Sequence, residues 1–165
     1  MANKINNVQA VQQALQNEMA LDPTVVVYGE DVGYEGGVFR ATVGLQQEFG
    51  ENRSFDTPLS ESAIVGTAVG MAINGFKPVV EMQFMGFSYP AFNQIISHVS
   101  RFRNRTRGER PMPIVIRAPY GGGIRALEHH SESTEAIYAH IPGLKVVIPS
   151  YSKIGRAVQQ ECRDR

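Results

Sequence analysis

The sequence predicts an α/β fold in which a parallel sheet is covered by helices on both faces. Short apolar runs typical of strands alternate along the chain with segments of helical periodicity. The apolar runs, such as "TVVVYGED" and "PIVIRAP", are continuous instead of alternating with polar residues. Strands buried on both faces have this pattern, and parallel sheets are the sheets that bury both faces. The 165 residues are enough for one domain with a sizeable core.

A helix opens the chain, because Val8, Val11, Leu15 and Met19 recur at helical spacing and Asn7 is a suitable cap. A strand and a short helix closed by Gly50 follow. The next long helix ends at Gly75 and Pro78, which are typical residues of a helix end. The predicted elements of this half are a strand over residues 24–31, helices over 43–50 and 61–75, and a strand over 78–84.

The second half continues the alternation, and a glycine-rich loop over residues 121–133 interrupts it. We expect residues 1–165 to form a single domain, because neither a repeat nor a linker is visible. The predicted elements are a helix over residues 91–102, a strand over 113–119, a helix over 134–141, a strand over 144–150 and a helix that begins at residue 153.

Composition argues against two classes of partner. Acidic and basic residues balance at sixteen each, so no overall field favours nucleic acid or an anionic membrane. No apolar run approaches the roughly 18 residues of a membrane helix. The single cysteine, Cys162, cannot form an internal disulfide and fits a reducing compartment, so we expect a cytoplasmic protein. The basic cluster Arg101–Arg110 fits either a solvated helix end or a surface for an acidic partner.

One carboxylate, Glu61, stands at the start of the apolar helix "ESAIVGTAVGMAING". In the first turn it complements the helix dipole, which is a structural role. A helix apolar on every face is expected to run through the interior. Burial at its start would then raise the pKa of Glu61 toward a range useful for proton exchange. Gly66 and Gly70 leave a smooth strip that another backbone or a flat ligand could approach.

Four stretches together resemble one enzyme family: "VVVYGEDVGYEGGVFRATVGLQQEFG", "FDTPLSESAIVGTAVGMAINGFKPVVEMQF", "GGGIRALEHHSES" and "PGLKVVIPS". They are similar to the beta subunits of thiamine-diphosphate-dependent 2-oxo acid dehydrogenases, and most similar to the bacterial pyruvate dehydrogenase (acetyl-transferring) type. The resemblance implies a transketolase-like pyrimidine-binding fold over nearly the whole chain. It implies that the C-terminal domain of the family is absent.

The resemblance assigns Glu61 to the "TPxxE" glutamate that hydrogen-bonds N1′ of the aminopyrimidine ring. A carboxyl there favours the imino form of the ring, which withdraws the proton from the thiazolium C2. It also assigns Phe87 to the aromatic wall of the ring, with Leu59, Gln83 and Phe84 nearby. Without the resemblance, the aromatic residues of "FMGFSYPAF" fit an ordinary core at the end of a strand.

His130 matches the active-site histidine of the family, with His129 beside it. An imidazolium there can hold the substrate carboxylate or a developing oxyanion and can serve acetyl transfer to lipoamide. Gly121, Gly122 and Gly123 allow backbone angles closed to other residues. Arg125 departs from several relatives, which carry another histidine at this place. On the residues alone, this stretch also fits a solvated surface loop.

The resemblance further implies partners. Glu30, Asp31 and Arg40 match motifs near the subunit junction and are expected to be interface or supporting groups. No Gly-Asp-Gly signature occurs, so the diphosphate and its magnesium are expected to be held by an alpha subunit. A second beta subunit and the lipoyl acyltransferase core are the other expected partners. The family often binds a structural potassium ion, and the matching positions are Ile114, Cys162 and Asp164.

Several functions stay open at this point. Pyruvate is the favoured substrate, with a branched-chain 2-oxo acid or acetoin as alternatives. A truncated, non-catalytic assembly module is an alternative of another class. A hydrolase using Ser131 or Ser133 with His130 lacks a Gly-x-Ser-x-Gly elbow. A metal site built on the four histidines lacks the usual ligand spacing.

Overall fold

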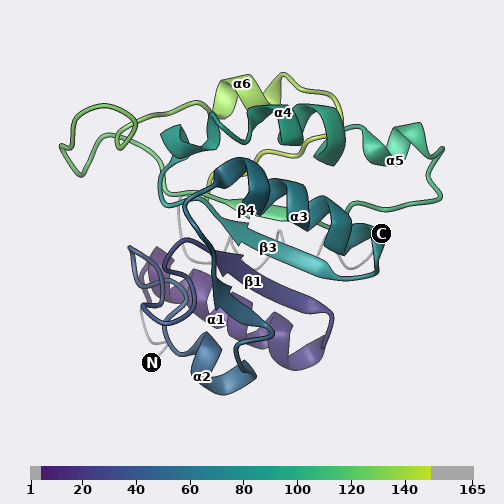
Figure 1. Ribbon diagram of the computed structural model, residues 1–165. Coiled ribbons are helices and arrows are strands. Elements are labelled where there is room, and N and C mark those ends of the chain that lie inside the picture. The colour runs from purple at the N-terminus through teal and green to yellow at the C-terminus, as the bar shows by residue number, and fades with distance from the viewer. Residues whose placement is uncertain (1–4, 150–165) are drawn as a thin grey trace.

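The computed structural model describes residues 5–149, which form a four-stranded sheet between two layers of helices (Figure 1). All strand pairings are parallel and the strand order is β2-β1-β3-β4, as the sequence predicts for the sheet type. Among these residues, no helix is long and apolar enough to cross a bilayer. The strands are β1 (Val25–Gly29), β2 (Ser54–Asp56), β3 (Lys77–Glu81) and β4 (Val115–Arg117).

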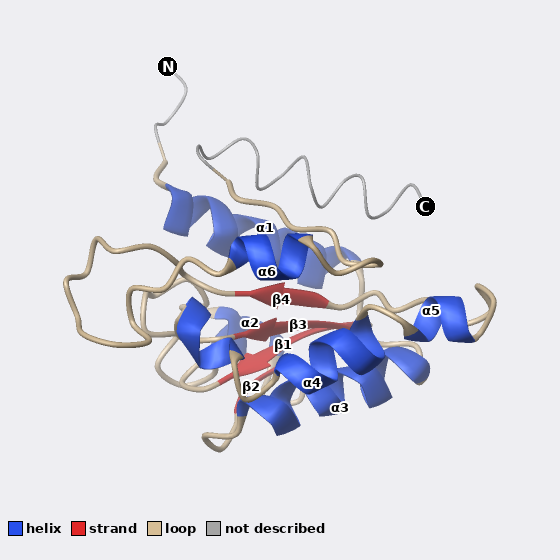
Figure 2. Cartoon of the chain, turned by 90° about the horizontal axis from the view of Figure 1, so that it is seen from above, coloured by secondary structure: helices blue, strands red, loops and turns tan. Residues whose placement is uncertain are grey.

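Helices cover both faces of the sheet, and Figure 2 shows α1 and α3 on opposite sides of it. The π-helical turn η2 lengthens the short helix α4, and a 3-10 turn, η1, follows β3. The helical elements are α1 (Asn7–Leu21), α2 (Leu45–Phe49), α3 (Glu61–Ile73), η1 (Met85–Ser88), α4 (Phe92–Gln94), η2 (Ile95–Val99), α5 (Phe102–Arg105) and α6 (Glu135–Ala139).

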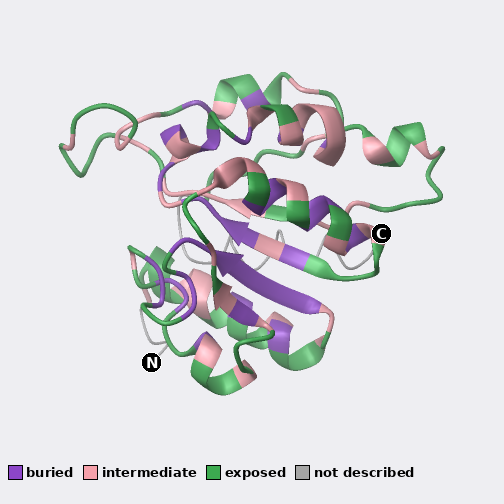
Figure 3. Cartoon of the chain, viewed as in Figure 1, coloured by how far each residue is buried: buried purple, intermediate pink, exposed green. Residues whose placement is uncertain are grey.

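The two faces of β1 bury different side chains, because successive residues of a strand point to opposite sides. Val25 and Val27 pack with Leu15 and Met19 of α1 in one apolar cluster. Val26 and Tyr28 pack with α3 and η2 in the other. All five residues of β1 are buried, which explains the continuous apolar run in the sequence (Figure 3).

The structure corrects three expectations. The cap of α1 is Asn6, whose side chain accepts a hydrogen bond from the Gln9 amide, and Asn7 is the first helical residue. Residues 54–56 form a strand that the sequence did not reveal, because "SFD" is too short to show a period. Residues 144–149 form no strand, although their apolar run predicted one. Val146, Val147 and Ile148 are 36–45 % exposed, and strand propensity alone does not supply a pairing partner.

Helix α3 also differs from the prediction that it runs through the interior. Ile64, Val65 and Ala68 are buried against the sheet, whereas Ala63, Thr67 and Gly70 are exposed on the opposite side. The helix therefore lies on one face of the sheet and keeps a strip of small residues open. Its end at Gly75, with φ of +91°, agrees with the prediction.

Candidate functional site

The described residues that were predicted to contact the cofactor and the substrate lie at one edge of the sheet. Because all four strands are parallel, the segments that follow them leave from the same edge. Figure 1 shows the loop of residues 118–134 projecting beyond this carboxyl edge, while α5 lies at the opposite end of the molecule. Ligands of open α/β sheets bind outside the carboxyl ends of the strands. This edge is therefore the candidate active site.

Glu30, the residue directly after β1, is an enclosed carboxylate at this edge. It is 5 % exposed, and neither of its carboxylate oxygens has a hydrogen-bond partner in the described structure. Desolvation, together with the smaller effects of the charges of Glu61 and Asp31, raises the pKa of Glu30 to about 7. A buried carboxyl that keeps its proton near neutral pH can exchange it with a neighbour.

Glu61 is the first residue of α3, and its charge acts on Glu30. The expectation that α3 would enclose Glu61 is wrong for the described chain, since Glu61 is half-buried and Glu30 is the enclosed carboxylate. Nearby in sequence, Leu59 is 79 % exposed.

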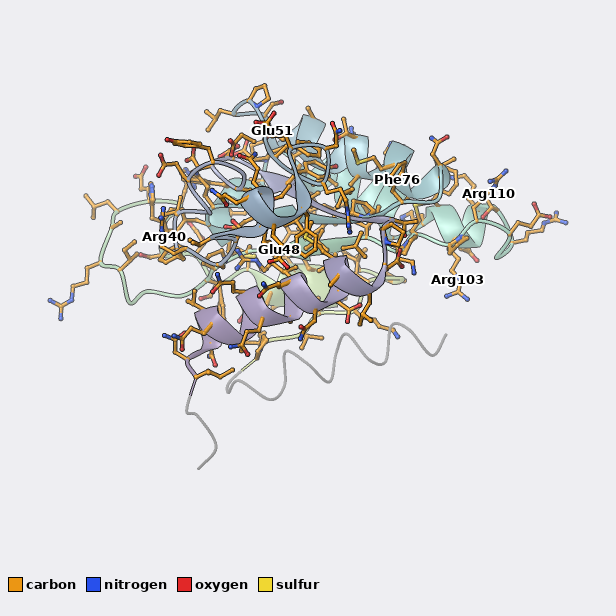
Figure 4. All side chains as sticks on the ribbon, turned by 90° about the horizontal axis from the view of Figure 1, so that it is seen from below. Arg40, Glu48, Glu51, Phe76, Arg103 and Arg110 are labelled. Carbon is orange, nitrogen blue, oxygen red and sulfur yellow. The ribbon has the colours of Figure 1, made fainter. Side chains whose placement is uncertain are left out.

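Hydrogen bonds fix the loop that carries Glu30. The amide of Gln83 donates to Oδ2 of Asp31 over 2.7 Å, which ties the ends of β1 and β3 together. Asp56, at the end of β2, accepts from the backbone amides of Gly33 (2.7 Å) and Tyr34 (3.0 Å). Gln83 is thus held beside the acidic residues. Arg40, from the same loop, lies on the surface and forms an ion pair with Glu35 (Figure 4).

A second ion pair lies beneath this edge. Glu81 closes β3 with 2 % exposure, and one of its oxygens accepts from the guanidinium of Arg117 on β4, while the other has no partner. Desolvation lowers the pKa of Arg117 to about 10. The pair joins the two strands that lead to the aromatic residues and to the histidines.

The aromatic residues form a cluster around His130. The imidazole contacts Phe84 and Phe87 edge to face, with ring centroids 4.7 and 5.0 Å apart. Phe39 packs on Phe84 from the loop after β1. A hollow of about 220 Å³ opens beside them, lined by Phe39, Phe84, His130 and residues 119–121, 123 and 124. Pockets for whole ligands are roughly 300–1,000 Å³, so this hollow suits part of a ligand.

Phe87 therefore contacts the histidine, and its role as the wall of a flat ring stays a prediction. It is half-buried, so part of its surface stays open. The left-handed backbone of the loop falls mostly on residues other than glycine. Of the three glycines only Gly121 has a positive φ, whereas Arg125, Glu128 and His129 all have one.

Two other predicted sites gain no support. The hydroxyl of Ser131 donates to the carbonyl of Ala126 over 3.0 Å, so it is not directed at His130 as a nucleophile. Among residues 5–149 no cluster of metal-ligating side chains is present. Of the potassium positions, Ile114 precedes β4, and Cys162 and Asp164 lie outside the described residues.

Residues 3–158 match the family described as the pyrimidine binding domain of transketolase. The chain belongs to this family. The pyruvate dehydrogenase E1 component subunit beta of Acholeplasma laidlawii is 58 % identical over 88 % of this chain and 45 % of its own length. The 3-methyl-2-oxobutanoate dehydrogenase subunit beta of Mycobacterium tuberculosis is 57 % identical over 91 % of this chain and 43 % of its own.

The pyrimidine-binding domain thus spans less than half the length of these relatives. A solved structure described as a split gene transketolase, an inactive beta4 tetramer, superposes with a TM-score of 0.74 over 99 % of this chain and 49 % of its own. Its sequence identity is 19 %, so it supports the fold alone. The transketolase-like fold predicted from the sequence is confirmed.

Proposed function

We propose that this chain is the pyrimidine-binding part of the beta subunit of pyruvate dehydrogenase (acetyl-transferring), which decarboxylates pyruvate and transfers the acetyl group to lipoamide. One observation carries the proposal. In a chain of this family, Glu61 stands at the start of α3 with the enclosed carboxyl of Glu30 close enough to interact. This pair fits the polar side of an aminopyrimidine, and the aromatic cluster fits its flat face.

When bound, thiamine diphosphate supplies the carbon nucleophile that attacks the 2-oxo acid and stabilises the charge left by decarboxylation. In our proposal, Glu61 holds a proton at N1′ of the pyrimidine ring. Below about pH 7 Glu30 keeps its own proton. Two carboxyls in different environments can take different roles in one site.

The other residues of the proposed site orient and enclose the pyrimidine ring. Phe87 provides the wall of the ring, Leu59 covers it, and Gln83 lies beside it, fixed by Asp31. His130 faces the substrate side, where an imidazolium stabilises a developing oxyanion or the substrate carboxylate.

The sequence has no Gly-Asp-Gly signature, so we assign the diphosphate and its magnesium to an alpha subunit. A second beta subunit and the lipoyl acyltransferase core complete the proposed assembly, which we place in the cytoplasm. A potassium ion at Ile114, Cys162 and Asp164 belongs to the same proposal.

A branched-chain 2-oxo acid is the second candidate substrate, because relatives named for pyruvate and for 3-methyl-2-oxobutanoate are equally similar, at 58 % and 57 % identity. We expect thiamine diphosphate with magnesium to bind only when an alpha subunit is present, and the assembly to decarboxylate pyruvate faster than 3-methyl-2-oxobutanoate in a dye-coupled assay. Equal rates would remove the preference for pyruvate. Failure to bind with the alpha subunit present would favour a non-catalytic assembly module.

A further inference from the structure

The turn after β3 and the loop that carries His130 are in direct backbone contact. We call residues Phe84–Tyr89 the aromatic turn and residues Leu127–Ser131 the histidine loop. A Cβ atom placed on Gly86 would lie 2.4 Å from the carbonyl oxygen of His129 and 2.7 Å from its Cα. Real Cβ atoms do not approach backbone so closely, so the loop can dock in this position only because residue 86 is glycine.

Side chains hold the same contact from the outside. The hydroxyl of Tyr89 donates to Oε2 of Glu132 over 2.9 Å, and the Tyr89 ring meets His129 edge to face at 5.9 Å. The docked loop is strained, because Glu128 and His129 have φ of +28° and +61°. Left-handed backbone is unfavourable for such residues, because their Cβ crowds the following carbonyl oxygen. Docking against the aromatic turn compensates for this cost.

The imidazole of His130 is held by two aromatic ring contacts and at one of its nitrogens. Phe84, which is 8 % exposed, and Phe87 contact the ring. Nδ1 lies 2.8 Å from the carbonyl oxygen of Glu128 and 3.2 Å from that of Leu127. Carbonyl oxygens only accept hydrogen bonds, so Nδ1 carries the hydrogen in this arrangement. In the neutral ring the available lone pair is then on Nε2.

We propose that the aromatic turn positions His130 so that only Nε2 is presented to the substrate, with Gly86 and Tyr89 as positioning residues. Gly86 admits the histidine loop, Tyr89 fastens it through Glu132, and Phe84 orients the ring. The inference rests on the proposed function for the role of His130. The geometry itself does not depend on that role.

Diethyl pyrocarbonate, which acylates neutral imidazole nitrogens, reports on the ring without requiring activity. Labelling of His130 in the enzyme assembled with an alpha subunit is followed by tandem mass spectrometry, which separates His130 from His129. We expect Gly86→Ala to raise the labelling rate of His130 about tenfold and to lower kcat by about 10- to 100-fold, with little change in KM, since a displacement of 1 Å can cost 100-fold. Tyr89→Phe should raise the labelling rate of His130 about threefold and lower kcat about threefold.

Tyr34→Phe is the matched control, because it removes a hydroxyl from a tyrosine that is 77 % exposed on another loop. It should leave labelling unchanged. If Gly86→Ala fails to fold, Tyr89→Phe decides the matter. The inference would be overturned if the labelling rate of His130 and kcat both stayed within about 1.5-fold of the wild type. This test applies to Gly86→Ala, or to Tyr89→Phe if Gly86→Ala does not fold. Full activity of His130→Ala would instead refute the proposed role of His130, while labelling would still test the positioning.

Discussion

The two ends of strand β3 treat carboxyl groups in opposite ways. At the amino end, Nζ of Lys77 lies 2.7 Å from Oδ2 of Asp22. Asp22 also accepts from the amide and the hydroxyl of Thr24. These hydrogen bonds, chiefly the one from Lys77, hold the pKa of Asp22 well below its ordinary range. Every contact there stabilises the ionised carboxylate.

At the carboxyl end, two carboxyls are enclosed without enough partners. Glu81 has one partnered and one unpartnered oxygen, and Glu30 has no described partner at all. The pKa of Glu30 moves in the opposite direction from that of Asp22. Five of the six described non-glycine residues with positive φ also follow β1 or β4, with Arg107 as the exception. Unsatisfied charge and backbone strain are concentrated where the proposed site lies, as is common at functional sites.

Glu61→Gln should give the largest effect on function. The amide cannot hold the proton at N1′, so we expect turnover of the assembled enzyme to fall by about 10² to 10⁴-fold, with no loss of thermal stability. Glu51→Gln makes the same chemical change at an exposed position before β2 (Figure 4) and should be neutral. Unchanged turnover in Glu61→Gln would show that Glu61, at the carboxyl edge of the sheet, takes no part in the mechanism.

Arg117→Met should give the largest effect on stability. It leaves the carboxylate of Glu81, which is 2 % exposed, without its cation, and breaking a buried pair on one side costs about 3–5 kcal/mol. Denaturant unfolding measures this change. The double variant Glu81→Gln with Arg117→Met should recover part of the loss, because the unpaired charge is gone. A double variant less stable than Arg117→Met would contradict the burial argument.

Glu30→Gln should change how stability depends on pH. The pKa of Glu30 is raised from 4.5 to about 7 in the folded chain, so the unfolded chain loses its proton first as pH rises. Wild-type stability should therefore fall between pH 4.5 and 7, and the variant should escape about 3 kcal/mol of that fall. Thermal melts across this range measure it. If the stability of Glu30→Gln and that of the wild type changed with pH in the same way, Glu30 would not be enclosed as described.

Lys77→Met should have the smallest effect, about 0.5–1 kcal/mol at pH 7, because the lysine side chain is half exposed. Because the pKa of Asp22 is lowered in the folded chain, its ion pair stabilises the fold at pH values above 3.8, the ordinary pKa of the group. This stabilisation is lost as the pH falls below 3.8. The difference between Lys77→Met and the wild type should thus vanish in strong acid. A loss as large as that of Arg117→Met would erase the contrast between the two ends.

The sequence predicts the elements that follow from local patterns better than the buried polar groups at the carboxyl edge, which lack hydrogen-bond partners. The apolar run of β1 and the end of α3 at Gly75 follow from local patterns, and both are confirmed. Strand β2 was missed, and the strand predicted over residues 144–150 is absent from 144–149, because pairing depends on distant neighbours. Enclosure of Glu30 instead of Glu61 depends on how loops after different strands converge, which no local pattern encodes. The packing of His130 on Phe87 has the same origin.

The central claim, that the carboxyl of Glu61 holds a proton at N1′ of the bound pyrimidine, can be measured directly by ¹⁵N NMR of thiamine diphosphate labelled at N1′ in the assembled enzyme. We expect the N1′ resonance to shift toward that of the protonated ring in the wild type and to stay at the unprotonated position in Glu61→Gln at equal occupancy. A protonated N1′ in both proteins would contradict the account.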